Sequence, residues 1–142
     1  MAESLLIVRV GDQFFGVDVA LARSVLPSVA VTPVPGSPPF VKGVSNIDGT
    51  IIAVIDVATR LSIRSDDSCQ RACLVETSKG PAVLLVDDAL EVVAIDQIQA
   101  VMAEESPFIV GTGSATLTHL RDEPLEAVVL LINTDGVCGV AA

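Results

Sequence analysis

The stretch FVKGVSNIDGTIIAVIDV, residues Phe40 to Val57, decides the fold because it contains a complete β-hairpin. Two apolar runs flank the sequence Asn-Ile-Asp-Gly, and an Asp-Gly pair between apolar strands is a strong hairpin signal. Asp48 therefore puts a carboxylate at the tip of a stiff hairpin, and the reason for it has to be sought in the rest of the chain.

The second strand of this hairpin is apolar on both faces. Alternation gives one face Ile51, Ala53, Ile55 and Val57, and the other face Ile52 and Val54. A strand with this pattern is buried on both sides at its centre. We expect Ile51, Ala53 and Ile55 to point toward the core.

The composition predicts an all-β protein with an aliphatic core. The chain has 142 residues, which suits one domain, and 51% of them are hydrophobic while only 3% are aromatic. It contains 23 valines, and β-branched side chains favour the pleated surface of a sheet.

Charge and local composition exclude several classes of protein. The formal net charge is −10 and there are only two lysines, so the basic footprint of a nucleic-acid binder is missing and an anionic membrane surface is disfavoured. Glu3 precedes the first apolar run, unlike the basic start of a secretory signal. The longest uncharged window, 24–41, holds five prolines, which excludes a membrane-spanning helix. Three cysteines are an odd number, so we expect reduced thiols and a cytoplasmic protein.

Three further hairpins are expected outside the opening stretch. Their strands are Leu5–Val10 with Phe14–Val19, Ala72–Glu76 with Ala82–Val86, and Thr116–Leu120 with Leu125–Asn133. Val19–Leu26 has apolar residues four apart and precedes Pro27, which favours a short helix or an irregular turn. Thr59–Gln70 is polar and is the best candidate for a linker, while Ile95–Val110 is ambiguous.

A weak internal repeat relates two parts of the chain. VDVAL (17–21) matches VDDAL (86–90), and AVIDVATRL (53–61) resembles LLINTDGV (130–137), with Asp56 and Asn133 at the ends of the apolar strands. Chance also produces such matches in valine-rich sequence, so chance and duplication both stay open. Duplication predicts two small barrels with cores at about residues 11–61 and 80–137, and closure of the barrels would protect their edge strands.

Residues that carry chemistry are sparse. A metal site needs three or four converging ligands, but the chain has one histidine, His119, and Cys69 and Cys73 lack a partner pair, so we expect no metal and no cofactor. The chain has no G-x-S-x-G elbow, and GTGS at 111–114 lacks the Walker lysine, which favours a flexible turn. This inventory indicates an interaction domain, with an apolar binding surface inside a polar rim, rather than an enzyme.

The sequence resembles the CheW family of chemotaxis coupling proteins and the related regulatory domain of the histidine kinase CheA. Three segments carry the resemblance: VGDQFFGVDV, PPFVKGVSNIDGTIIAVIDV and VLLVDDALEVVAIDQI. The family motif is matched at Pro38, Phe40, Lys42, Gly43, Val44, Asn46, Gly49 and Asp56. The resemblance implies one CheW-like domain over residues 1–142, with two intertwined five-stranded SH3-like β-barrels around a shared hydrophobic core and few short helices.

The resemblance also implies a function. Members of the family are non-enzymatic adaptors that couple the cytoplasmic tips of chemoreceptors to the kinase regulatory domain in a signalling array. Carried over to this chain, the partner-binding residues would come from both barrels: Ala22, Gly43, Asn46, Asp48, Gly49, Val83, Ala89 and Val92. Two alternatives stay open, namely a free-standing relative of the kinase regulatory domain that caps or tunes an array, and a small enzyme that uses His119.

Asp48 departs from the family pattern. The family has Arg at this position and tends to have Glu at the position of Ser24, and in the family those two residues pair. Loss of both partners leaves no orphan charge, so the change is neutral for the fold in one interpretation. In the other, a position that couples partners has reversed its sign and the chain accepts an altered partner. Both interpretations stay open.

Overall fold

The computed structural model describes the chain except for residues 1–2, 66–69, 96, 103–105, 119–123 and 140–142. The described part contains eleven strands and two short helices. The strands are β1 Glu3–Val10, β2 Gln13–Asp18, β3 Ala22–Leu26, β4 Val41–Ile47, β5 Thr50–Asp56, β6 Arg71–Thr77, β7 Gly80–Val86, β8 Asp88–Ile95, β9 Gln99–Ala100, β10 Ile109–Leu117 and β11 Leu125–Ile132. The helices are α1 Val57–Arg60 and α2 Thr134–Cys138.

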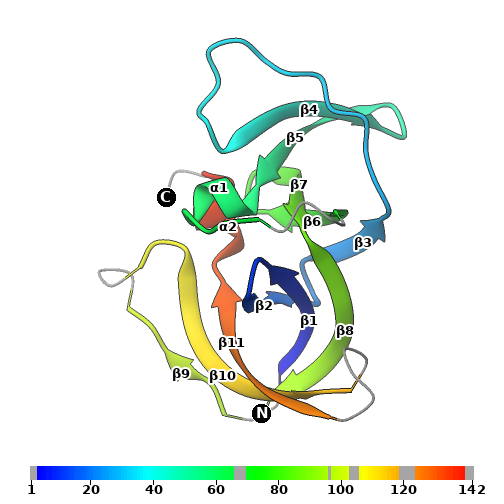
Figure 1. Cartoon of the computed structure of the whole chain (residues 1–142). Helices are drawn as coiled ribbons and strands as arrows, with labels where there is room; N and C mark the ends of the chain where they lie inside the picture. The colour runs from blue at the N-terminus through cyan, green and yellow to red at the C-terminus, as the bar shows by residue number, and fades with distance from the viewer. Residues whose placement is uncertain (1–2, 66–69, 96, 103–105, 119–123, 140–142) are drawn as a thin grey trace.

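The strands form two sheets, one above the other in Figure 1, with α1 and α2 near the level where the sheets meet. The lower sheet has the order β8-β1-β2-β11-β10-β9, and the upper sheet has the order β3-β6-β7-β5-β4. The prediction of an all-β fold with few short helices is confirmed. The SH3-like form of each barrel stays a prediction. The upper sheet has the five strands expected of each barrel, and the lower sheet has a sixth, the two-residue β9.

The two parts of the chain exchange strands between the sheets. In the six-stranded sheet, hairpin β1–β2 lies between β8 and β11, and β2 pairs in parallel with β11. In the five-stranded sheet, hairpin β6–β7 lies between β3 and β5, and β5 pairs in parallel with β7. Each sheet thus has a central hairpin from one part of the chain and flanking strands from the other, so neither sheet coincides with the range 11–61 or 80–137.

The connections in the first part of the chain recur in the second. A register shift interrupts the start of β4 and also the start of β10. The segment that precedes each of these strands also pairs with it. Thr32 forms an antiparallel bridge with Val44 of β4, and β9 pairs with β10. Helix α1 begins after Asp56 and α2 begins after Asn133. The weak sequence repeat therefore corresponds to a repeated connectivity, which favours duplication over chance.

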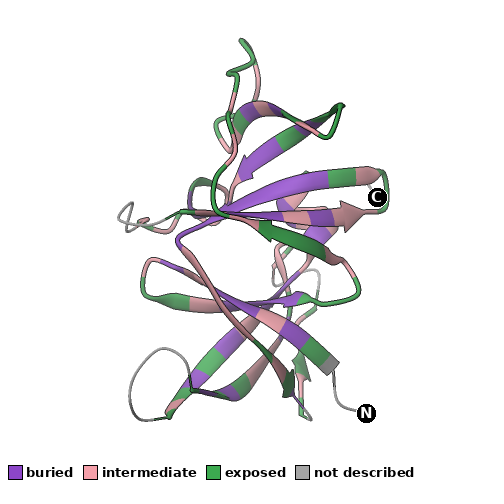
Figure 2. Ribbon diagram, turned by 90° about the vertical axis from the view of Figure 1, so that its right-hand side faces the viewer, coloured by how far each residue is buried: buried purple, intermediate pink, exposed green. Residues whose placement is uncertain are grey.

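Three clusters of buried apolar side chains form the core. The largest lies between the sheets and takes residues from both, among them Val8, Phe15, Ile55, Leu84 and Val137. A second cluster lines the six-stranded sheet and a third lines the five-stranded sheet. Buried residues follow the strands of both sheets, whereas the loop between β3 and β4, at the top of Figure 2, is largely exposed. The sheets therefore share one central core, as predicted.

All four predicted hairpins are present, as β1–β2, β4–β5, β6–β7 and β10–β11. The prediction for Val19–Leu26 was wrong from residue 22 onward, because Ala22–Leu26 is strand β3, which pairs with the edge of β6. Ile95–Val110 contains the end of β8, all of β9 and the start of β10, while Thr59–Gln70 begins inside α1. Residues 66–69 of that linker and 119–120 of the expected Thr116–Leu120 strand lie outside the described residues.

The predicted inward face of β5 is wrong for two of its three residues. Ile52 and Val54 are only 4% and 0% exposed, while Ile51 is 64% exposed and Ala53 is also exposed. Ile55 is buried as predicted, because it reaches the shared core at the end of the strand where the sheets meet. A strand with two apolar faces does not reveal by alternation which face its own sheet encloses.

The prediction of a flexible turn at GTGS is also wrong, because these residues lie inside β10. A Cβ atom at Gly111 would lie 2.7 Å from Cγ2 of Ile98, and one at Gly113 would lie 3.0 Å from Cγ2 of Ile95. Both glycines therefore make room for neighbouring isoleucine side chains that pack against the strand. Glycine at these positions reflects close packing and does not indicate a loop.

Candidate functional site

The tip of the β4–β5 hairpin is a two-residue turn built from Asp48 and Gly49. Their φ angles are 51° and 90°, and two positive φ angles are the requirement of a type I′ turn. The side-chain oxygen of Asn46 accepts a hydrogen bond of 2.9 Å from the Gly49 N–H. All three predicted tip residues, Asn46, Asp48 and Gly49, are exposed, and each of them contributes to the turn.

Ser24 and Asp48, the two positions that depart from the family pattern together, lie on opposite edges of the five-stranded sheet. Ser24 is exposed on edge strand β3, and Asp48 follows edge strand β4. The segment after β3 returns to β4, where Thr32 exchanges backbone hydrogen bonds of 2.8 and 2.9 Å with Val44. The two edges are thus joined through this segment rather than across the sheet.

Two of the predicted groove residues pack against the shared core, and a third is exposed on the same strand as one of them. Ala22 on β3 and Ala89 on β8 are half-buried and pack against the central cluster. Val92 lies opposite half-buried Leu6 in the β1–β8 pairing and is 60% exposed. Together they give the margin between the sheets an apolar character.

The other two predicted groove residues are buried inside the five-stranded sheet. Val83 on β7 is fully buried, and Gly43 on β4 is buried with a φ angle of 150°. A Cβ atom at Gly43 would lie 2.1 Å from the carbonyl oxygen of Thr32. Only glycine permits this close crossing. The structure therefore does not present the side chain of Val83 or the backbone of Gly43 on an exposed surface.

Two exposed apolar residues were missed by the sequence analysis. Ile51 on β5 is 64% exposed and Val128 on β11 is 68% exposed. Each lies five positions before the N-cap residue of the following helix, Asp56 or Asn133. They are therefore equivalent positions of the repeat. The signal that identifies them is this equal spacing within the two matched strands.

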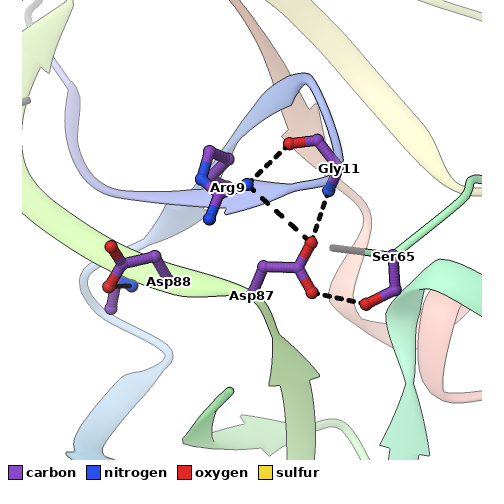
Figure 3. Close-up of polar contacts among 6 residues, drawn as sticks. Arg9, Gly11, Ser65, Asp87 and Asp88 are labelled. Carbon is purple, nitrogen blue, oxygen red and sulfur yellow. Dashed lines mark hydrogen bonds and ion pairs between the residues drawn. The ribbon is translucent and has the colours of Figure 1, made fainter. Parts of the chain in front are cut away.

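A buried carboxylate fixes the point where the chain passes from one sheet to the other (Figure 3). Asp87, between β7 and β8, is 2% exposed and accepts hydrogen bonds from the Gly11 N–H at 2.7 Å and the Ser65 hydroxyl at 2.6 Å. Arg9 Nη1 lies 4.0 Å from Oδ2 of Asp87 and donates to the Gly11 carbonyl at 2.8 Å. Asp87 thereby joins the β1–β2 turn, the segment after α1 and the β7–β8 junction.

The two described cysteines are not activated as nucleophiles. Burial raises the pKa of the Cys73 thiol to about 11. Burial also raises the pKa of Cys138 to about 11, with a further contribution from Asp135. Thiols with such pKa values are protonated near neutral pH and are poor nucleophiles. His119 and Cys69, the other candidates from the sequence, lie outside the described residues.

An open pocket of about 620 Å³ lies between the segment after α1 and strands β2, β10 and β11. Among the described residues, its lining is mainly apolar, with Phe15, Leu61, Phe108 and Leu130, and includes no acidic, histidine or cysteine side chain. Within the described ranges, no group of three or more His, Cys, Asp or Glu residues has the arrangement to hold a metal ion. Neither of the two described helices is long and apolar enough to cross a membrane.

Comparison with known proteins yields one consistent group of relatives. The family model described as CheW-like domain matches residues 4–139. The chain is 31% identical over 87 residues to the chemotaxis protein CheW of Rhizobium meliloti, covering 61% of this chain and 56% of the relative. It is 35% identical over 92 residues to the chemotaxis protein CheW of Thermotoga maritima, covering 64% and 61%. The aligned part of this chain thus spans less than two thirds of either relative.

A solved structure is similar over nearly the whole length of both chains. It is the crystal structure of the scaffolding protein TtCheW from Thermoanaerobacter tengcongensis. The TM-score is 0.76 at 26% sequence identity, and the match covers 94% of this chain and 90% of that one. The two-sheet arrangement described above is therefore the fold of that scaffolding protein.

Proposed function

The chain belongs to the CheW-like domain family, and on this basis we propose that it is a non-enzymatic adaptor in the cytoplasm that couples a chemoreceptor tip to the regulatory domain of a histidine kinase. Relatives named chemotaxis protein CheW and the likeness to a scaffolding protein support the proposal. The mainly apolar pocket and the protonated thiols agree with a role in binding rather than in chemistry.

The observation that carries the proposal is the apolar margin between the two sheets. Val92 is 60% exposed on β8, opposite Leu6, while Ala89 on the same strand and Ala22 on β3 are half-buried against the shared core. An apolar surface of this kind gains free energy when a partner removes it from water, by about 25 cal/mol for each Å² buried. We assign receptor-tip binding to this margin.

A binding experiment separates the adaptor from its main alternative. Receptor-tip peptide is immobilised, this protein is added, and retention of a separately purified kinase regulatory domain is measured with and without it. An adaptor retains the kinase domain only when this protein is present. A module that caps an array binds one of the two partners and retains nothing further, and that result would contradict the proposal.

Substitution of Val92 tests the assigned margin. Val92→Asp should weaken receptor-tip binding at least tenfold, about 1.4 kcal/mol, because the new charge has to be desolvated at an apolar contact. Its melting temperature should stay close to that of the parent, since the side chain is mostly exposed. Val128→Asp is the matched control, an exposed valine elsewhere on the same sheet, and should leave receptor binding unchanged. Equal loss in both variants would remove the assignment.

A further inference from the structure

The guanidinium group of Arg60, at the end of α1, lies between two aromatic rings. Its Cζ atom is 3.8 Å from the ring centroid of Phe40 and 4.8 Å from that of Phe108. Its Nη2 donates a hydrogen bond of 3.1 Å to the carbonyl of Gly136 in α2. A cation over an aromatic face within about 6 Å is attracted to it, more strongly where water is excluded.

The two rings occupy equivalent positions of the repeat. Phe40 immediately precedes β4, and Phe108 immediately precedes β10. The carbonyl of Phe40 accepts a hydrogen bond of 2.8 Å from the Asp56 N–H, and the carbonyl of Phe108 accepts one of 2.7 Å from the Asn133 N–H. Each of these bonds closes the base of a hairpin, β4–β5 in one case and β10–β11 in the other. One side chain therefore contacts the bases of both hairpins.

The position of Arg60 depends on these contacts. Among the described residues, its Nε atom is buried without a hydrogen-bond partner. Space beside Arg60 and Phe40 is also restricted, because a Cβ atom at Gly139 would lie 3.2 Å from Cζ of Phe40 and 3.8 Å from Nη2 of Arg60. With Nε unbonded, the two rings and the Gly136 carbonyl hold the guanidinium. If one ring moves away, the guanidinium loses one of its contacts and is held less firmly against the other ring.

We propose that Arg60 couples the bases of the two hairpins, so that loosening of one base is transmitted to the other. The coupling is a property of the fold itself and goes beyond the adaptor function, since it exists without any partner. It links the two surfaces that expose Ile51 and Val128, which lie on these hairpins. Arg60 is a positioning residue in this proposal, because it acts through Phe40 and Phe108.

Native-state hydrogen exchange of the full chain tests the coupling at two amides, those of Asp56 and Asn133. Phe108→Leu should accelerate exchange of the Asp56 amide by roughly two- to thirtyfold, the range of a cation–π contact, although residue 108 belongs to the other hairpin. Phe40→Leu should accelerate exchange of the Asn133 amide to a similar extent. In an Arg60→Leu background, the effect of each phenylalanine substitution on the base amide of the other hairpin should disappear.

Controls separate coupling from general destabilisation. The amide of Leu84, in the central core, reports the global change and should shift less than the two base amides. Arg23→Leu removes a guanidinium from an exposed ion pair with Glu76 and should leave both base amides unchanged. If Arg60→Leu does not fold, Arg60→Lys serves instead, because it keeps the charge without the planar group and should reduce the cross effects. Cross effects that persist undiminished in the Arg60 variant, that are absent in the parent background, or that equal the shift at Leu84 would overturn the proposal.

Discussion

Replacement of Asp87 by alanine should destabilise the protein more than any exposed acidic substitution. The carboxylate is 2% exposed, accepts two hydrogen bonds of 2.7 and 2.6 Å, and lies 4.0 Å from a guanidinium nitrogen of Arg9. Asp87→Ala removes this buried acceptor from the Gly11 N–H and from the Arg9 guanidinium, both of which are half-buried. Breaking a buried charge pair from one side costs about 3–5 kcal/mol. That is a large fraction of the roughly 5–15 kcal/mol of a typical domain.

Two further variants allow the cost of Asp87→Ala to be compared with smaller losses in the same protein. Asp87→Asn keeps an oxygen for the Gly11 N–H, and its NH₂ group can donate to the Ser65 hydroxyl. Only the charge is lost, so we expect about 1–2 kcal/mol, the difference between charged and neutral hydrogen bonds. Asp18 is the repeat equivalent of Asp87, but it is exposed and accepts one local bond of 2.9 Å from the Ala20 N–H. Asp18→Ala should therefore cost about 0.5–1 kcal/mol.

The assay is urea unfolding followed by far-ultraviolet circular dichroism, with the slope m compared between variants. An unchanged m-value with a lower midpoint identifies a loss of stability of the folded state. The order of cost should be Asp87→Ala, then Asp87→Asn, then Asp18→Ala. If Asp87→Ala and Asp18→Ala agree within about 0.5 kcal/mol, the buried carboxylate does not fasten the junction between the sheets, and the reasoning is refuted.

Four other outcomes are expected. Ile55→Asp should cost about 3–5 kcal/mol because its charge is buried without a partner, whereas Ile51→Asp on the exposed face should leave the melting temperature unchanged; equal effects would contradict the orientation of β5. Iodoacetamide at pH 8 should spare Cys73 in the folded protein and label it in urea, as site-resolved mass spectrometry would show, because burial raises the pKa of its thiol to about 11. Ser62→Gly should raise stability by up to about 1 kcal/mol, since a φ angle of 56° strains a residue with a Cβ atom; a lower unfolding midpoint would argue against this. Asp48→Arg combined with Ser24→Glu should bind a generic kinase regulatory domain or receptor tip more tightly than the parent and than either single variant, because it restores both charges of the family pattern; identical binding by all four proteins of the double-mutant cycle would favour the neutral interpretation.

The hairpins were predictable because their signals are local. The alternation on both sides of Asp48-Gly49 specifies strand, turn and strand within a few residues, and the turn has the positive φ angles that this pair permits. Strand β3 was not predictable in this way. Its apolar spacing also suits a helix, and its extended form depends on pairing with Cys73 and Ala72, which lie far along the chain. Local propensity yields to such tertiary pairing.

The candidate site was predicted in part, because family motifs identify positions and not their exposure. Val92 and Asp48 are exposed and able to meet a partner, while Val83 is covered by neighbouring strands that the sequence does not order. Arg60 was missed because a single arginine carries no motif. The repeated phenylalanines before β4 and β10 were the available signal, and the significance of their spacing emerges only when the strand exchange brings both rings to one side chain.

The exchange of strands between the sheets has a consequence for synthesis on the ribosome. Phe14 of β2 pairs with Val129 of β11, so the first hairpin to emerge has no parallel neighbour until almost the whole chain has been made. Translation proceeds at about 5–20 residues per second, and contacts so distant in sequence form slowly. During that interval, the edge of a valine-rich hairpin is open to pairing with other nascent chains. Most of the net charge of −10 comes from the second part of the chain, because residues 1–60 contain five acidic and four basic side chains, so mutual repulsion opposes such pairing only late in synthesis. We therefore expect unfinished chains on a polysome to be most prone to aggregation before the acidic second part of the chain has been made.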